Sequence, residues 1–200
     1  MDEIVREALV KWPNVPACTG WLLLDRRGQW RMRDAAAQAN GTAGEVIRHA
    51  ALLGFINRNY DCDTQGQWFF QNGPQRVYVE LAYTPWIVRL GAEAESGALT
   101  LTDQAGQTFE PALGLIDEEG SVLFATHAAT PHSPRIALLH DHDLGLFASH
   151  ATLADDGQSG AFHWRSTHTL TLENIARAQV ARRFGFVASP AALAAPPSGL

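Results

Sequence analysis

Histidine is concentrated in one part of the 200-residue chain, because seven of the eight histidines lie within residues 127–168. The densest group there is the run His140-Asp141-His142-Asp143. If this run is a strand, His140 and His142 point to the same side, because side chains alternate along a strand. Two imidazoles placed in this way can share a transition metal such as zinc, with a carboxylate or a third histidine from elsewhere completing the site.

A polar strand end that leads into a loop explains the same histidines without any metal. No H-E-x-x-H or C-x-x-C pattern accompanies them in the sequence. Both interpretations stay open at this point. A metal-binding protein or metal-dependent enzyme, with His140 and His142 as ligands, is therefore the alternative function.

Other side chains combine positive charge with aromatic rings. Arginine offers a planar fork that binds phosphate or carboxylate at two points, and an aromatic ring can stack on a base. Along the expected strand at residues 76–81, polar and apolar side chains alternate, so that Arg76, Tyr78 and Glu80 share one face. An arginine opposite a glutamate on a sheet is also explained as a solvated cross-strand pair. We predict a binding set for a small anionic, nucleotide-like ligand that consists of Arg76, Tyr78, Trp86 and Arg135.

The sequence favours a binding protein over an enzyme. Cys18 and Cys62 are the two cysteines, and neither has a histidine beside it in the sequence. The sequence contains no G-x-S-x-G elbow, no P-loop and no G-x-G-x-x-G motif. We therefore expect no catalytic residue and no cofactor. A third hypothesis is a structural module that binds a partner protein.

Composition and charge limit the classes of partner that the sequence favours. The chain is 46% hydrophobic and 18% charged, which is typical of a soluble globular protein, and no run approaches the ~20 apolar residues of a membrane span. Residues 1–90 carry ten basic and nine acidic residues, a charge of +1, whereas residues 91–200 carry five and twelve, a charge of −7. Neither part is basic enough for a nucleic-acid binder. We expect a cytoplasmic protein without membrane or nucleic-acid partners, and we leave homo-oligomer formation open.

One turn motif recurs along the chain. It consists of Asp, two variable residues, Gly and then Gln or Ser. The Asp side chain bonds the backbone that follows, and Gly takes the left-handed position that closes a bulged hairpin. The motif therefore predicts hairpins, and the turn role of its aspartates is favoured over ion binding. It begins at Asp25, Asp63, Asp103 and Asp117.

The helices expected between these hairpins are few. Apolar spacing predicts one from Asp2 to Trp12. A capping box at residues 42–45 predicts the start of a second, and a third runs from about Leu172 to Phe184 with Gly185 as its C-cap.

This order of elements predicts an α+β fold made of two related antiparallel-sheet units with few helices. The recurrence of hairpins suggests a duplication. We expect a helix and a hairpin–helix–hairpin unit at residues 1–90, a β-rich unit with a closing helix at residues 91–187, and a disordered tail at residues 188–200.

The stretches at residues 60–70, 73–80 and 84–86, with their strands and their D-x-x-G-x-W turn, resemble an uncharacterised bacterial family, the domain of unknown function 1285 family. The resemblance covers roughly residues 20–150, with the second half matched through residues 134–139 and their flanks. It implies a hairpin–helix–hairpin unit joined to a pleckstrin-homology-like unit. It also implies a cleft between the two units for a nucleotide-like ligand, and a role in sensing or signalling.

Overall fold

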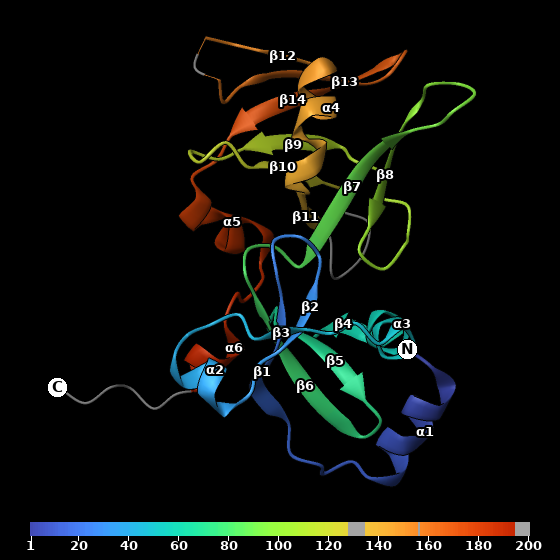
Figure 1. Cartoon of the computed structure of the whole chain (residues 1–200), viewed down its shortest axis with the longest axis vertical. Coiled ribbons are helices and arrows are strands. Elements are labelled where there is room, and N and C mark those ends of the chain that lie inside the picture. The colour runs from blue at the N-terminus through green and yellow to red at the C-terminus, as the bar shows by residue number, and fades with distance from the viewer. Residues whose placement is uncertain (128–134, 156, 195–200) are drawn as a thin grey trace, which may run out of the picture. The chain divides into compact units, whose positions relative to one another are not determined.

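The computed structural model describes residues 1–127, 135–155 and 157–194 (Figure 1). The chain divides into two compact units. The first unit comprises Met1–Asp25, Gln29–Tyr83 and the segment that starts at Phe186, and the second comprises Arg26–Gly28 and Thr84–Gly185. The predicted boundary after residue 90 is therefore wrong, because residues 84–90 already belong to the second unit.

The first unit is built on one sheet. Within the described residues this sheet has six strands in the order β3-β2-β1-β6-β5-β4. Strands β1 and β6 run parallel, and the other neighbours are antiparallel. The strands are β1 (Cys18–Leu24), β2 (Trp30–Met32), β3 (Glu45–Val46), β4 (Tyr60–Cys62), β5 (Trp68–Asn72) and β6 (Gln75–Leu81). The helices are α1 (Glu3–Lys11), α2 (Ala35–Ala39), α3 (Ala50–Arg58) and α6 (Pro190–Ala194).

The second unit is built on a larger sheet. In the described part of the chain it has eight strands in the order β12-β13-β14-β9-β10-β11-β7-β8. The strands are β7 (Trp86–Ala92), β8 (Leu99–Asp103), β9 (Leu113–Ile116), β10 (Val122–Ala125), β11 (Ile136–Leu139), β12 (Ala151–Leu153), β13 (Gly160–Arg165) and β14 (His168–Asn174). The helices are the short 3-10 helix η1 (Asp141–Asp143), α4 (Leu144–Ser149) and α5 (Arg177–Phe184).

The two sheets share one strand topology. In the first unit the hairpin β1–β2 is followed by the meander β4–β5–β6, and β6 returns to pair in parallel with β1. In the second unit the hairpin β7–β8 is followed by the meander β9–β10–β11, and β11 pairs in parallel with β7. The predicted α+β fold with two related sheet units is confirmed. The sheets are mixed rather than purely antiparallel, because β6 runs parallel to β1 in the first unit, and β11 runs parallel to β7 and β14 to β9 in the second. The pleckstrin-homology likeness of the second unit stays a prediction.

The predicted turn chemistry is confirmed at all four motifs. At the turn after Asp117, its Oδ1 accepts hydrogen bonds from the backbone N–H groups of Glu119 at 3.0 Å and Ser121 at 2.7 Å. The same oxygen acts as acceptor in the turns after Asp25, Asp63 and Asp103. The glycine of each motif has a positive φ between 74° and 80°. The repeated aspartates are thus explained by backbone hydrogen bonding.

Two of the predicted helix boundaries are wrong. Glu45–Val46 forms β3 and pairs with β2, and α3 begins only at Ala50, where Nδ1 of His49 accepts a hydrogen bond from Leu52 N–H at 3.2 Å. The capping box fails because Gly44 has φ +77°, a left-handed conformation that does not belong to the first turn of an α-helix, and a Cβ at this position would clash with the carbonyl of Met32.

The second wrong boundary is the start of the last predicted helix, at Leu172. Leu172 is 2% exposed and belongs to β14, which continues to Asn174 and pairs with β9. Helix α5 starts five residues later than predicted, at Arg177, and ends at Gly185 in the left-handed conformation, as expected for its C-cap. The N-terminal helix is also confirmed, as α1.

The segment that follows α5 is ordered as far as residue 194, which corrects the prediction of a disordered tail from residue 188. Leu81 N–H donates to the carbonyl of Ala188 at 2.8 Å. Ser189 Oγ donates to Glu80 Oε2 at 2.5 Å, and Ala191 N–H donates to Glu80 Oε1 at 3.0 Å. Glu80, which is only 6% exposed, thereby anchors this segment. Residues 195–200 lie outside the described residues.

Each unit has its own aromatic core. In the first unit the rings of Trp30 and Tyr60 lie 5.0 Å apart between centroids, and those of Tyr60 and Trp68 lie 4.8 Å apart. In the second unit Phe147 of α4 stacks on Phe162 of β13 at 5.0 Å, which fixes α4 against the sheet. No helix in the described part of the chain is long and apolar enough to span a membrane.

The turn at Asp117 provides a test of this fold. Its side chain is fully buried, so Asp117→Ala leaves two backbone N–H groups without their acceptor. We expect the free energy of unfolding to fall by about 2–4 kcal/mol, measured by urea denaturation. Asp117→Asn keeps an acceptor oxygen and is expected to lose less than half as much. Equal losses in the two variants would contradict the proposed role of the oxygen.

Candidate functional site

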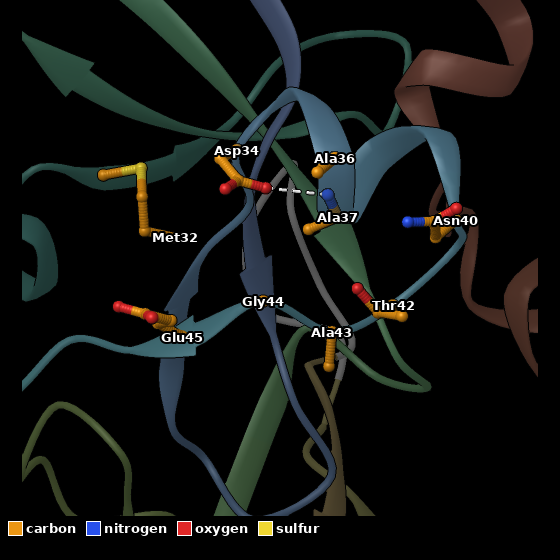
Figure 2. Close-up of a pocket in the computed structure, with 9 residues that line it drawn as sticks. All are labelled: Met32, Asp34, Ala36, Ala37, Asn40, Thr42, Ala43, Gly44 and Glu45. Carbon is orange, nitrogen blue, oxygen red and sulfur yellow. Dashed lines mark hydrogen bonds between the residues drawn. The ribbon is translucent and has the colours of Figure 1, made fainter.

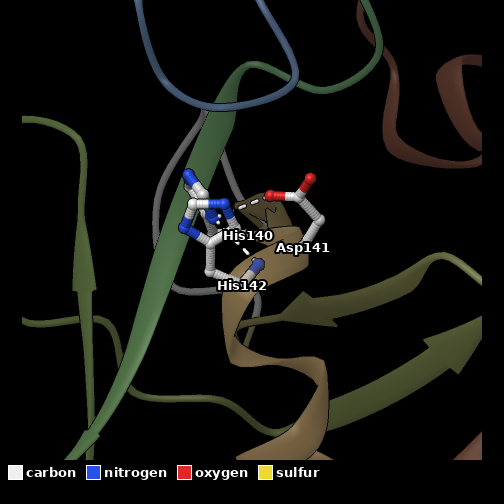
Figure 3. Close-up of side chains that lie close together, drawn as sticks. All are labelled: His140, Asp141 and His142. Atoms are coloured by element: carbon white, nitrogen blue, oxygen red, sulfur yellow. Dashed lines mark hydrogen bonds and ion pairs between the residues drawn. The ribbon is translucent and has the colours of Figure 1, made fainter.

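His140, Asp141 and His142 lie in the turn that joins β11 to α4 (Figure 3). The sequence prediction assumed a strand here, with Asp141 on the side opposite to the histidines. That assumption is wrong, because β11 ends at Leu139 and the next residues wind into η1. Winding brings Asp141 to the histidines: one ligand atom from each of the three residues lies within 4.8 Å of the others. The structure therefore supplies the carboxylate that the sequence left unassigned.

The next carboxylate, Asp143, attaches this turn to the neighbouring strand β7. Asp143 Oδ2 accepts hydrogen bonds from Arg89 Nε at 2.7 Å and from Leu90 N–H at 3.0 Å, and its Oδ1 accepts from Arg89 Nη2 at 2.9 Å. The backbone N–H of His140 donates to the carbonyl of Val88 at 2.9 Å. Both ends of the turn are thus bound to β7, so that the backbone position of the three residues is set by the sheet.

The surroundings of His140 favour the neutral form of its imidazole. Burial lowers the pKa of His140 below its ordinary value, and the positive charge of Arg89 acts in the same direction. His140 Nδ1 accepts a hydrogen bond from His142 N–H at 3.2 Å, which fits an unprotonated nitrogen. The hydrogen bond from Arg27 lowers the pKa of Asp141. Arg27 reaches Oδ2 of Asp141 at 2.6 Å, whereas Oδ1 lies 3.0 Å from His140 Nδ1.

Trp86 and Arg135 come together in the second unit. The guanidinium of Arg135 lies 3.9 Å from the ring centroid of Trp86. Its Nη2 donates to Oδ2 of Asp103 at 2.5 Å, and the side chain of Asp103 is fully buried. Arg135 is thus neutralised by an acid of its own unit. The contact of Arg135 with Trp86 is explained as packing, and its contact with Asp103 is explained as an ion pair.

Arg76 and Tyr78 come together in the first unit, on β6. The guanidinium of Arg76 lies 4.0 Å from the ring centroid of Phe69 on β5 and 6.0 Å from that of Tyr78. Tyr78 Oη donates to Asp63 Oδ2 at 3.2 Å. The structure therefore divides the four predicted residues into two pairs, one in each unit. A solvated pair of Arg76 with a glutamate, the alternative explanation of this face, does not involve Glu80, because Glu80 is buried and bonded to Ser189 and Ala191.

A pocket that the sequence did not indicate lies beside α2 in the first unit (Figure 2). Its volume is about 560 Å³, and its carboxylates come from Asp34 and Glu45. Asp34 Oδ1 accepts a hydrogen bond from Ala37 N–H at 2.7 Å and thereby caps α2. The lining residues are mostly small and exposed: Met32, Asp34, Ala36, Ala37, Asn40, Thr42, Ala43, Gly44 and Glu45. A short cap signal around Asp34 is the sequence feature that could have located it.

The two thiols are poorly suited to nucleophilic chemistry. Burial, together with the charges of Asp63 and Asp61, raises the pKa of Cys62 to about 12. Burial also raises the pKa of Cys18. A thiol acts as a nucleophile through its thiolate, so both groups are held in the unreactive form.

Comparison with known proteins places the chain in a family. The family model DUF2944, whose description reads "Protein of unknown function (DUF2946)", matches residues 1–191. The chain belongs to the DUF2944 family. No curated protein matches this DUF2944 member.

Two solved structures are similar to this DUF2944 protein. A DUF1285 family protein from Silicibacter pomeroyi DSS-3 shares 14% identity with a TM-score of 0.47, covering 88% of this chain and 97% of that chain. A DUF1285 family protein from Shewanella baltica OS155 shares 11% identity with a TM-score of 0.40, covering 64% of this chain and 91% of that chain. Both structures belong to the domain of unknown function 1285 family, which is the family that the sequence resembles; at these identities and TM-scores they carry no argument about the membership or the function of this chain.

The buried pair of Arg135 and Asp103 is testable by a charge-removing change. Asp103→Asn keeps the turn acceptor at this position but leaves the guanidinium of Arg135, which is 28% exposed, without its counter-charge. We expect a loss of about 2–3 kcal/mol in the free energy of unfolding by urea denaturation. Asp155→Asn, at an exposed turn of the same unit, is the control and should change stability by less than about 0.5 kcal/mol. Unchanged stability in Asp103→Asn would return Arg135 to the binding set.

The raised pKa of Cys62 predicts slow alkylation. A pKa of about 12 against the ordinary 9.0 lowers the thiolate fraction at pH 8 by about 1,000-fold. In a Cys18→Ala variant, we expect iodoacetamide to modify native Cys62 at least about 100-fold more slowly than the urea-unfolded chain. Mass spectrometry over time measures both rates. Similar rates in the two states would show that the thiol is exposed and active.

Proposed function

We propose that this DUF2944 protein binds a small anionic, ring-bearing ligand and that Arg76 is the main contact. The observation that carries the proposal is the state of the Arg76 guanidinium. It is half-buried on the ring of Phe69, and within the described residues it donates no hydrogen bond and forms no ion pair. Its contacts there are with aromatic rings.

The chemistry of such an arginine matches an anionic ligand. A guanidinium carries five N–H donors in one plane, and stacking on a ring leaves the edge of that plane open. Phosphate and carboxylate groups accept two parallel hydrogen bonds from this edge. The aromatic platform also fixes the fork, so that less side-chain entropy is lost when the anion binds.

Tyr78 supplies the second part of the proposed contact. The ring of Tyr78 lies on the same face of β6 as Arg76 and is half-buried. Tyr78 is directly opposite Phe69 on β5. The hydrogen bond from its hydroxyl to Asp63 restricts the ring. A restrained aromatic ring beside a guanidinium suits a planar group next to an anionic group, as in a nucleotide.

Trp86 and Arg135 are left out of the proposed contact. Asp103 already neutralises Arg135, and an added anion would have to compete with a fully buried carboxylate. The proposal therefore differs from the four-residue set that the sequence predicts. The cleft between units that the resemblance implies stays a prediction.

We propose binding without catalysis, in a sensing role in which the bound ligand favours one state of the protein for a partner to recognise. The raised pKa of Cys62 makes this thiol a poor nucleophile, so the proposal assigns it no catalytic role. The cytoplasmic location and the expectation of no nucleic-acid or membrane partner stay predictions.

The test is a thermal-shift titration of the full chain with AMP, ATP and inorganic phosphate as probes. We expect a rise in Tm with the nucleotides that grows with concentration, because a ligand that binds the folded state stabilises it. Arg76→Ala should weaken binding at least about tenfold, which corresponds to the loss of one charge-assisted contact. Arg76→Lys should retain part of the affinity, because it keeps the charge but loses the fork.

The matched control is Arg48→Ala. Arg48 is an exposed arginine of the same unit, so this change removes the same charge away from the Phe69 platform. We expect nucleotide binding by Arg48→Ala to equal that of the unchanged chain. The proposal is wrong if no probe raises Tm, or if Arg76→Ala and Arg48→Ala bind the probes equally well.

A further inference from the structure

The anionic-ligand proposal does not involve the turn between β11 and α4. We infer that His140, Asp141 and His142 form a binding site for one divalent transition metal ion, with zinc as the expected occupant. The three residues are consecutive, and one ligand atom from each lies within 4.8 Å of the others. The two rings meet edge to face with their centroids 4.8 Å apart, and Figure 3 shows the carboxylate of Asp141 directed back toward His140.

The distances are close to those of a bound ion. Zinc binds imidazole nitrogen and carboxylate oxygen at about 2.0–2.2 Å in a tetrahedron, which puts neighbouring ligand atoms about 3.3–3.5 Å apart. His140 Nδ1 and Asp141 Oδ1 are already 3.0 Å apart. The ring of His142 is exposed, so rotation about its side-chain bonds is the movement that would complete the set.

The carboxylate of Asp141 is held as a metal ligand requires. Arg27 contacts Oδ2 through both Nε, at 3.1 Å, and Nη2, at 2.6 Å. Oδ1 is the oxygen that faces His140. A carboxylate can therefore bind the ion through Oδ1 while its other oxygen keeps the hydrogen bonds from arginine. Such outer partners orient metal ligands and are part of many known sites.

The buried histidine, His140, is also held in position by its neighbours. Both ends of the turn are bound to β7, through Asp143 with Arg89 and Leu90 and through the backbone N–H of His140 with Val88. His140 is 7% exposed, and its hydrogen bond from His142 N–H occupies the Nδ1 lone pair. Coordination at Nδ1 replaces that one hydrogen bond by a metal bond. The cost is local, because the fold of the turn depends on Asp143.

The ligand types select the metal. Two imidazoles and one carboxylate suit zinc, cobalt, nickel or copper, whereas calcium and magnesium prefer sets of oxygen atoms. Three protein ligands leave the fourth tetrahedral position for water or another small ligand. The expected occupant in a cell is zinc, and cobalt is the spectroscopic substitute.

The experiment uses the full chain, prepared without an affinity tag and stripped of metal with a chelator. Equilibrium dialysis against Zn²⁺, followed by elemental analysis, should give one zinc per chain, and Mg²⁺ should not compete. With Co²⁺, visible absorption bands of tetrahedral intensity should appear and saturate at one equivalent. His142→Ala removes one exposed ligand and should weaken zinc binding at least about tenfold, with Tm of the metal-free protein unchanged.

Two further variants complete the design. Asp141→Asn keeps the shape of the side chain but removes the charge, and should also weaken zinc binding at least about tenfold. His168→Ala removes an exposed histidine of the same unit outside the turn and should bind zinc like the unchanged chain. His140→Ala is not used, because it also removes a buried side chain and leaves a cavity beside β7. Less than half an equivalent of zinc, or equal affinity in His142→Ala and the unchanged chain, overturns the inference.

Discussion

The parallel pairing of the first and last strands is the contact on which each unit depends. Leu24 on β1 pairs with Leu81 on β6, and Val88 on β7 pairs with Leu139 on β11. Each pairing joins segments more than fifty residues apart, so the hairpin and the meander of a unit become one sheet only when it forms. Both candidate sites lie on the strand that closes the sheet. Arg76 lies on β6, and the metal-binding turn begins directly after β11.

Buried acids are the second common feature, and each has a structural partner. Asp103 pairs with Arg135, Asp143 with Arg89, Asp117 accepts two backbone N–H groups, and Glu80 anchors the segment before α6. Unpaired carboxylates are costly inside a protein, which explains why these four are matched. Asp103 thus gives Arg135 a counter-charge within its own unit, whereas the contacts of Arg76 are with aromatic rings.

Features that depend on neighbouring residues could be predicted well. The Asp–Gly turns, α1 and the Gly185 cap were predictable because a few adjacent residues determine each of them. The failures share a cause. The capping box at residues 42–45 and the helical spacing at Leu172 are genuine local signals, but pairing with β2 and β9 overrides both. The histidine run lies in the turn after β11 rather than on a strand, so the assumed alternation of side chains does not apply to Asp141.

The sequence by itself determined the α+β class, the turns and the residue types available for binding, because composition and short-range backbone chemistry set these. Only the tertiary structure decided which residues meet. It divided the predicted anionic-ligand set between two units, neutralised Arg135 with Asp103, and brought Asp141 to the two histidines. The physical reason is that a strand's partners and the direction of the chain after it depend on contacts distant in sequence. The residues adjacent in the sequence do not determine those contacts.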